Sequence, residues 1–136
     1  MSDEQALAVS PDKVCFLIGK AREFHAKEEV VIPEEPSAPA DDWALQVLAD
    51  HKDDPSYLEL HELIDAMDVE EQINLVALMW LGRGDFSTAE WNEALEEAGD
   101  RLSAHTADYI IATPLVADYL EEGLSALGYT CEGITE

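Results

Sequence analysis

The nine residues from Ile73 to Leu81, INLVALMWL, restrict the fold more than any other stretch of the chain. Apolar residues fill eight of these nine positions, so in a helix they cover most of its circumference. A helix that is apolar on all sides is buried on all sides. The stretch therefore predicts a central helix wrapped by other helices or, alternatively, a helix with one face in an oligomer interface.

Other segments predict the helices that surround it. Ser10, Pro11 and Asp12 are typical of a helix start, and apolar residues then recur at helical spacing as far as Lys27. Residues 105–112, HTADYIIA, are interpreted as a turn or a short apolar connector. Further surrounding helices are expected over residues 42–51, 56–66, 87–102 and 113–128, and the central helix itself is expected over residues 68–81. The predicted fold class is all-α, a compact orthogonal bundle of five to six helices around the central apolar helix.

A chain of 136 residues is long enough for one hydrophobic core, and residues 10–128 are expected to form a single helical domain. Residues 1–9 are expected to be disordered and residues 129–136 to form a frayed C-terminal tail. Three prolines exclude a helix over residues 28–42. This acidic, Pro-rich segment is either a flexible linker or an extended arm, and the apolar residues 30–32 favour an arm that docks on the domain.

Two helix starts carry the pattern of a capping box, in which a side-chain oxygen and a carboxylate three residues later each accept a free backbone N–H. Ser56 and Glu59 fit this pattern before the helix 56–66. Asp68 and Glu71 fit it before the central helix.

The stretch from Trp80 to Trp91, WLGRGDFSTAEW, predicts a corner between two helices. Gly82 stands where a left-handed residue often follows a helix, and Gly84 permits a second unusual backbone angle. Arg83 places positive charge at the negative end of the helix dipole.

The second half of this corner predicts the start of the next helix. Ser87 and Glu90 fit another capping box, and Phe86 with Trp91 fits a hydrophobic staple across it. The apolar spacing of that helix continues through Gly99, so the helix either bends there or stops.

Arg83-Gly84-Asp85 is also the adhesion tripeptide, but the motif is short and chance occurrence is the better interpretation. The functional alternative is that Arg83 clamps an anion or a carboxylate, with Asp85 as the neighbouring binding residue. Capping of the helix and a structural ion pair explain Arg83 more simply.

The charge balance excludes several partners. Seven Lys and Arg face 31 Asp and Glu, which gives a net charge of −24. Such a chain repels nucleic acid and anionic membranes, so direct binding to either is not expected, and a basic protein is the favoured partner. Residues 11–27 alone are basic, with a net charge of +2. The first helix is therefore expected to dock on the acidic body within one chain or between two, and the second arrangement predicts a homodimer.

His61 and Asp65 are four residues apart on a predicted helix, which is a spacing that places two metal ligands on one face. His51 is the candidate for a third ligand. In so acidic a chain this pairing is expected by chance, and neither an HExxH motif nor an EF-hand loop is present. The candidate serines are explained as helix caps, so the sequence predicts no catalytic residue and no cofactor.

The acidic start of the chain and its short apolar runs indicate neither a signal peptide nor a membrane span, so a cytoplasmic protein is expected. In that compartment Cys15 and Cys131 are expected to be free thiols.

Two motifs, NLVALMWLGRGDF and TPLVADYLEEGL, resemble a family of small acidic bacterial proteins known as a domain of unknown function. The resemblance covers residues 14–128 and implies one helical domain in a bacterial cell. It supplies no catalytic residues.

Three functions are compatible with these observations. The leading hypothesis is a non-enzymatic module that presents an acidic surface to a basic protein. A second is a small metal-dependent enzyme that uses His61 and Asp65. A third is a mimic of nucleic acid, which requires carboxylates ordered about 1.7 Å apart along an axis.

Overall fold

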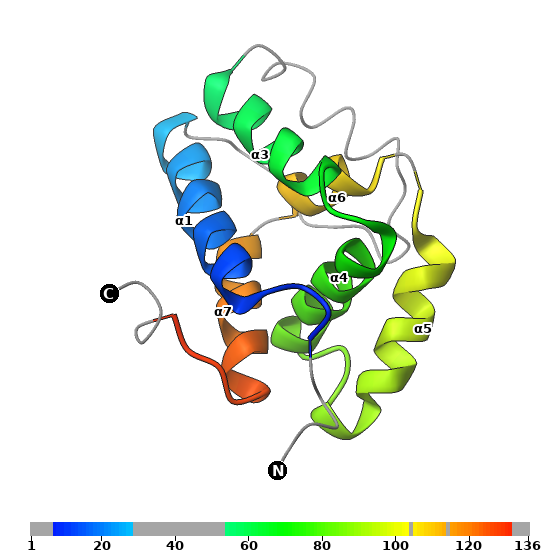
Figure 1. Ribbon diagram of the computed structural model, residues 1–136. Coiled ribbons are helices and arrows are strands. Elements are labelled where there is room, and N and C mark those ends of the chain that lie inside the picture. The colour runs from blue at the N-terminus through cyan, green and yellow to red at the C-terminus, as the bar shows by residue number, and fades with distance from the viewer. Residues whose placement is uncertain (1–6, 29–53, 104, 114, 132–136) are drawn as a thin grey trace.

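The apolar stretch forms helix α4 (Val69–Arg83), which lies in the middle of the structure (Figure 1). The computed structural model describes residues 7–28, 54–103, 105–113 and 115–131. Every residue from Asn74 to Leu81 is buried in the single chain. The predicted central helix is therefore confirmed, and its burial requires no second subunit.

Five other helices surround α4, and the described residues contain no strand. The fold is all-α, as predicted. Helices α5 and α7 pack directly on α4, α1 packs on α7 and α3, and α6 packs on α3 (Figure 1). The elements around α4 are α1 (Pro11–Glu28), α3 (Pro55–Asp65), the 3-10 turn η3 (Thr88–Glu90), α5 (Trp91–Arg101), α6 (Thr106–Ala112) and α7 (Val116–Ala126).

Helix α1 buries one apolar stripe against the bundle. Five of its side chains recur at helical spacing and are almost fully buried: Val14, Leu17, Ile18, Ala21 and Phe24. The predicted arm over 28–42 and the short helix over 42–51 lie outside the described residues, except that Glu28 still belongs to α1.

The crossing of α4 and α7 depends on two glycines. A Cβ atom on Gly82 would overlap the backbone carbonyl oxygen of Tyr119, and a Cβ on Gly123 would overlap that of Leu78. The two backbones therefore approach more closely than side chains allow. The prediction that Gly82 is the left-handed residue after α4 is wrong, because α4 continues through it and the left-handed residue is Gly84, with φ 97°.

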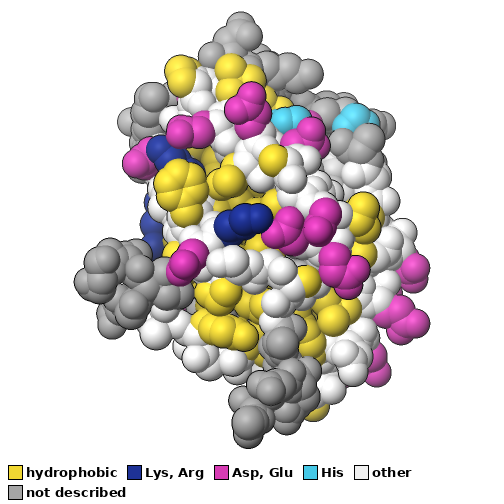
Figure 2. All heavy atoms as spheres, viewed as in Figure 1, with side chains coloured by type: hydrophobic (Ala, Val, Ile, Leu, Met, Phe, Trp, Pro, Cys, Tyr) yellow, Lys and Arg dark blue, Asp and Glu magenta, His cyan; other side chains and the backbone are white. Residues whose placement is uncertain are grey.

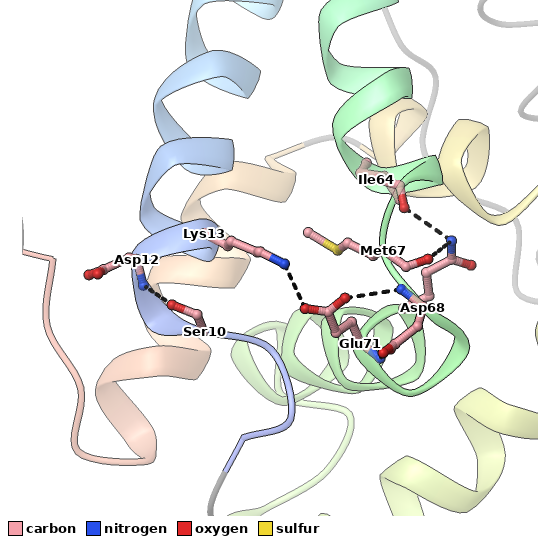
Figure 3. Close-up of polar contacts among 8 residues, drawn as sticks. Ser10, Asp12, Lys13, Ile64, Met67, Asp68 and Glu71 are labelled. Atoms are coloured by element: carbon pink, nitrogen blue, oxygen red, sulfur yellow. Dashed lines mark hydrogen bonds and ion pairs between the residues drawn. The ribbon is translucent and has the colours of Figure 1, made fainter.

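The start of α4 is held by the predicted capping box of Asp68 and Glu71 (Figure 3). The Glu71 N–H donates to Asp68 Oδ1 at 2.8 Å, and the Asp68 N–H donates to Glu71 Oε1 at 3.0 Å. Glu71 Oε2 also accepts from Lys13 Nζ of α1 at 2.8 Å. The Lys13 hydrogen bond, and then the Asp68 N–H, lower the pKa of Glu71 below its ordinary value of 4.5. One carboxylate thus joins the first helix to the central one.

We expect Glu71→Gln to reduce the acid sensitivity of the fold, because glutamine can keep the cap but not the charge. A lowered pKa means that the carboxylate stabilises the folded state above pH 4.5, and that this contribution is lost as the pH falls through the folded value. At neutral pH the free energy of unfolding of the variant should be lower by up to about 1 kcal/mol, which is what an exposed ion pair contributes. Urea unfolding between neutral pH and about pH 3 measures both effects.

Glu70→Gln is the matched control, since Glu70 lies on the same turn and makes no ion pair among the described side chains. An equal change in acid sensitivity for both variants would show that the Glu71 contacts are not responsible.

Three other helix boundaries differ from the predictions. Helix α3 begins at Pro55 under an Asp54 cap, whose Oδ1 accepts the Ser56 N–H at 2.7 Å, so the Ser56–Glu59 box is not used. Pro55 explains the difference, because proline suits the first helical position. Residues 105–112 were expected to be a turn or a short connector, but residues 106–112 are the helix α6. Helix α7 begins at Val116, three residues after Thr113, and Gly128 follows it with φ 94°.

The corner after α4 largely follows the prediction. The Ser87–Glu90 box is present, and Glu90 Oε1 accepts the Ser87 N–H at 2.8 Å. The box opens η3, which leads into α5, and α5 continues through Gly99 to Arg101. Phe86 stacks on Trp80, with ring centroids 6.0 Å apart, so its aromatic contact is with α4. Its predicted staple with Trp91 stays a prediction, although Trp91 is buried.

Residues at both ends of the described chain are fixed to the bundle. Val9 is fully buried and the Ala8 N–H donates to Asn74 Oδ1 at 3.2 Å, so the predicted disorder of residues 1–9 is wrong for residues 7–9. Cys15 and Cys131 form a disulfide, with Cα atoms 5.6 Å apart. The prediction of free thiols at Cys15 and Cys131 is therefore wrong. The prediction of a frayed tail is wrong for residues 129–131, which are attached to the bundle.

None of the helices described is both long and apolar enough to cross a membrane.

Candidate functional site

The Arg83-Gly84-Asp85 tripeptide is closed by its own side chains. Arg83 Nη2 and Nε donate to Asp85 Oδ2 at 2.6 and 2.9 Å. The left-handed Gly84 makes this possible, because it turns the chain so that Asp85 comes back to the last turn of α4. The two candidate binding residues thus satisfy each other, which is the structural ion pair that the sequence favoured over an external anion.

His61 faces a carboxylate other than the predicted one. Its Nε2 lies 3.9 Å from Asp108 Oδ1 of α6, and Asp65 is exposed on α3. Across the described ranges, no three His, Cys, Asp or Glu side chains gather as metal ligands would. The candidate third ligand, His51, lies outside those ranges. The structure therefore gives the metal-dependent enzyme no support.

Asp108 is a buried carboxylate that the sequence did not single out. The residue is 6% exposed, and its Oδ1 accepts from the hydroxyl of Tyr57 at 2.6 Å. The Tyr57 and His61 rings lie on successive turns of α3 with centroids 5.7 Å apart. Asp108 lies 51 residues from Tyr57 in the sequence, and no motif links the two.

This cluster joins α3 to α6 through a buried hydrogen bond. Burial, and then the hydrogen bond to Asp108, raise the pKa of the Tyr57 phenol. Tyr57 therefore keeps its proton and acts as a donor, not as a base. A second buried bond, from Trp80 Nε1 to the Tyr109 hydroxyl at 3.0 Å, similarly joins α4 to α6.

The described Lys and Arg side chains form ion pairs within the chain. Each Lys or Arg whose side chain is described contacts a carboxylate of the same chain. Those of α1 reach three other helices: Lys13 binds Glu71, Lys20 binds Glu59 at 3.2 Å, and Arg22 binds Asp118 and Glu121 at 3.0 and 2.7 Å. The basic first helix thus docks within one chain, one of the two arrangements that its charge predicted.

With the described Lys and Arg side chains paired, the charged groups left over are mostly carboxylates, and α5 presents them most regularly. Glu93, Glu96, Glu97 and Asp100 are exposed on its side away from α4, and we call these four residues the α5 acidic face. The opposite side buries Trp91, Ala94 and Ala98. The four positions span two helical turns, or about 10 Å along the axis. Figure 1 shows α5 at the right-hand edge of the bundle, where acidic side chains project in Figure 2.

Exposed carboxylates also occur on α1, α3, α4 and α7. On the face drawn in Figure 2 they are separated by apolar and uncharged side chains. This distribution differs from the single ordered row of charges that a mimic of nucleic acid requires.

The model of the family described as "Protein of unknown function (DUF3775)" matches residues 57–129, which is more than half of the chain. The chain belongs to this family. The match extends from α3 to just beyond α7, so it is narrower than the resemblance over residues 14–128 and does not include α1. No curated protein matches the chain, and no solved structure matches it.

Proposed function

We propose that this member of the family is a non-enzymatic protein-interaction module whose α5 acidic face binds a basic segment of a protein partner. The observation that supports the proposal most is the difference between the two kinds of charge. The described cations are all bound within the chain, whereas Glu93, Glu96 and Asp100 have no ion pair among the described residues.

The spacing of these carboxylates suggests the form of the partner. Positions 93, 96, 97 and 100 repeat at three and four residues, so they follow one side of the helix. Lys or Arg residues three to four apart on a partner helix would match them. Complementary charge of this kind speeds encounter and selects against acidic partners. A cytoplasmic location is part of the proposal.

A homodimer through α1 is not proposed, because Lys13, Lys20 and Arg22 bind carboxylates within the chain. The metal-dependent enzyme is also set aside, since His61 contacts Asp108 and the described residues assemble no set of three ligands.

The test is affinity capture from a lysate of the source cell with three forms of the full chain. The first is the wild-type protein, and the second carries Glu93→Gln, Glu96→Gln and Asp100→Asn. We expect the second form to capture at least about tenfold less of the basic protein than the wild type at about 0.1 M salt, where the Debye length is about 10 Å. Capture by the wild type should fall steeply as the salt concentration rises.

The third form is a control of equal charge with Glu62→Gln, Asp65→Asn and Glu122→Gln, which are exposed carboxylates of α3 and α7. It should keep its capture within about twofold. Equal losses for both variants would indicate unspecific attraction to negative charge, and no loss for either would remove α5 as the binding surface.

A further inference from the structure

The Cys15–Cys131 disulfide joins two segments that both lie outside the family match. Cys15 belongs to the second turn of α1, and Cys131 follows α7 by five residues. Both residues are half-buried at the edge of the core. The disulfide therefore lies outside residues 57–129, which the family model matches.

The segment that carries Cys131 leaves α7 by a turn. Gly128 has φ 94°, and the Tyr129 N–H donates to the Leu124 carbonyl at 2.8 Å. The Tyr129 side chain is half-buried against the core. Beyond Gly128 the segment lies outside any helix, so the disulfide is its covalent attachment to α1.

Helix α1, in contrast, is held independently of the disulfide. It buries five apolar side chains against the bundle, and this hydrophobic burial does not depend on the disulfide. Its Arg22 and Lys13 also bind α7 and α4. Loss of the sulfur–sulfur bond therefore leaves α1 docked, while Cys131 loses its covalent attachment to α1.

We propose that Cys15–Cys131 is a site of reversible thiol–disulfide exchange that ties Cys131 to α1 when oxidised and releases it when reduced. The co-reactant is a dithiol, either a small molecule or a protein. Its thiolate attacks one sulfur, which breaks the Cys15–Cys131 bond and forms a mixed disulfide. Its second thiol then displaces the remaining cysteine. The two electrons and two protons pass to the cysteines, and the dithiol leaves as a disulfide.

The test compares the folded full-length chain before and after treatment with dithiothreitol in the absence of denaturant. Alkylation followed by mass spectrometry counts free thiols, and hydrogen exchange follows the backbone. We expect no free thiol before treatment and two after it, since the chain has two cysteines. Exchange of the Cys131 amide should rise at least about tenfold, while residues 14–24 keep their protection. The double variant Cys15→Ser, Cys131→Ser should show the fast exchange with or without the reductant.

Three results would overturn the proposal. Two alkylated thiols in protein purified without reductant would show that the bond is not formed. Reduction that succeeds only in denaturant would make the disulfide a permanent structural bond. Loss of protection in residues 14–24 together with Cys131 would mean that reduction unfolds the bundle rather than releasing Cys131.

Discussion

Gly82→Ala is expected to lower the free energy of unfolding by about 3 kcal/mol or more, at the upper end for overpacking. The added Cβ would overlap the carbonyl oxygen of Tyr119 and come within 2.9 Å of the backbone nitrogen of Gly123. These are backbone atoms of α7 and cannot rotate away. Helices α4 and α7 would have to separate along their contact. Urea unfolding followed by circular dichroism measures the loss.

Gly99→Ala is the matched control, since it makes the same chemical change in the interior of α5. Here the Cβ meets only Ile73 Cδ1, at an ordinary contact distance of 3.5 Å. Alanine favours the helix over glycine, so the variant should gain about 0.5–1 kcal/mol. If the two substitutions shifted the free energy of unfolding in the same direction by similar amounts, the close backbone contact between α4 and α7 at Gly82 would be contradicted.

Leu78→Ala should cost about 2–5 kcal/mol, the range for removing a fully buried leucine. Leu78 has 0% exposure in the middle of α4, where it lies under α7 beside Gly123. The deletion leaves a cavity that the surrounding helices cannot close completely. The measurement is again the free energy of unfolding, made at several protein concentrations so that association is detected.

Val69→Ala provides the comparison on the same helix. Val69 is 60% exposed at the first position of α4, so its truncation should change stability by no more than about 0.5 kcal/mol. Comparable losses at positions 69 and 78 would indicate that burial along α4 is not distributed as described.

The sequence was sufficient where a single segment determines its own structure. Residues 74–81 are buried as their composition requires, because a helix without a polar side has no face for water. The caps at Asp68 and Ser87 were also predictable, since a capping box is formed by residues three apart. At α3 the predicted Ser56–Glu59 box was wrong, because Pro55 takes the first helical position and Asp54 caps the helix.

Features that join distant segments were not predictable. The role of Gly82 depends on Tyr119 and Gly123, about forty positions later, and a left-handed turn explained the same glycine equally well from sequence. The partnership of Cys15 and Cys131 required knowing that α1 and α7 lie side by side.

The candidate site shows the same difference. Arg83 and Asp85 are two residues apart, and the ion pair favoured for Arg83 is present. Asp108 was missed because, in a chain with 31 acids, nothing local marks one carboxylate as buried. Its burial follows from α6, a helix of seven residues with no side-chain cap to announce it. The apolar spacing of the helix that begins near Trp91 already implied which side faces the core, and Trp91 and Ala98 are buried there.

The proposed function depends on α4 being enclosed within one subunit, because the outer, acidic faces are then what a partner meets. Hydrogen exchange of the dilute full-length protein tests this most directly. We predict that the amides of residues 74–81 are the slowest in the chain, exchange only through global unfolding, and do so at a rate independent of protein concentration. Rapid exchange of these amides, or protection that increases with concentration, would show that α4 is completed by another subunit and would contradict the account.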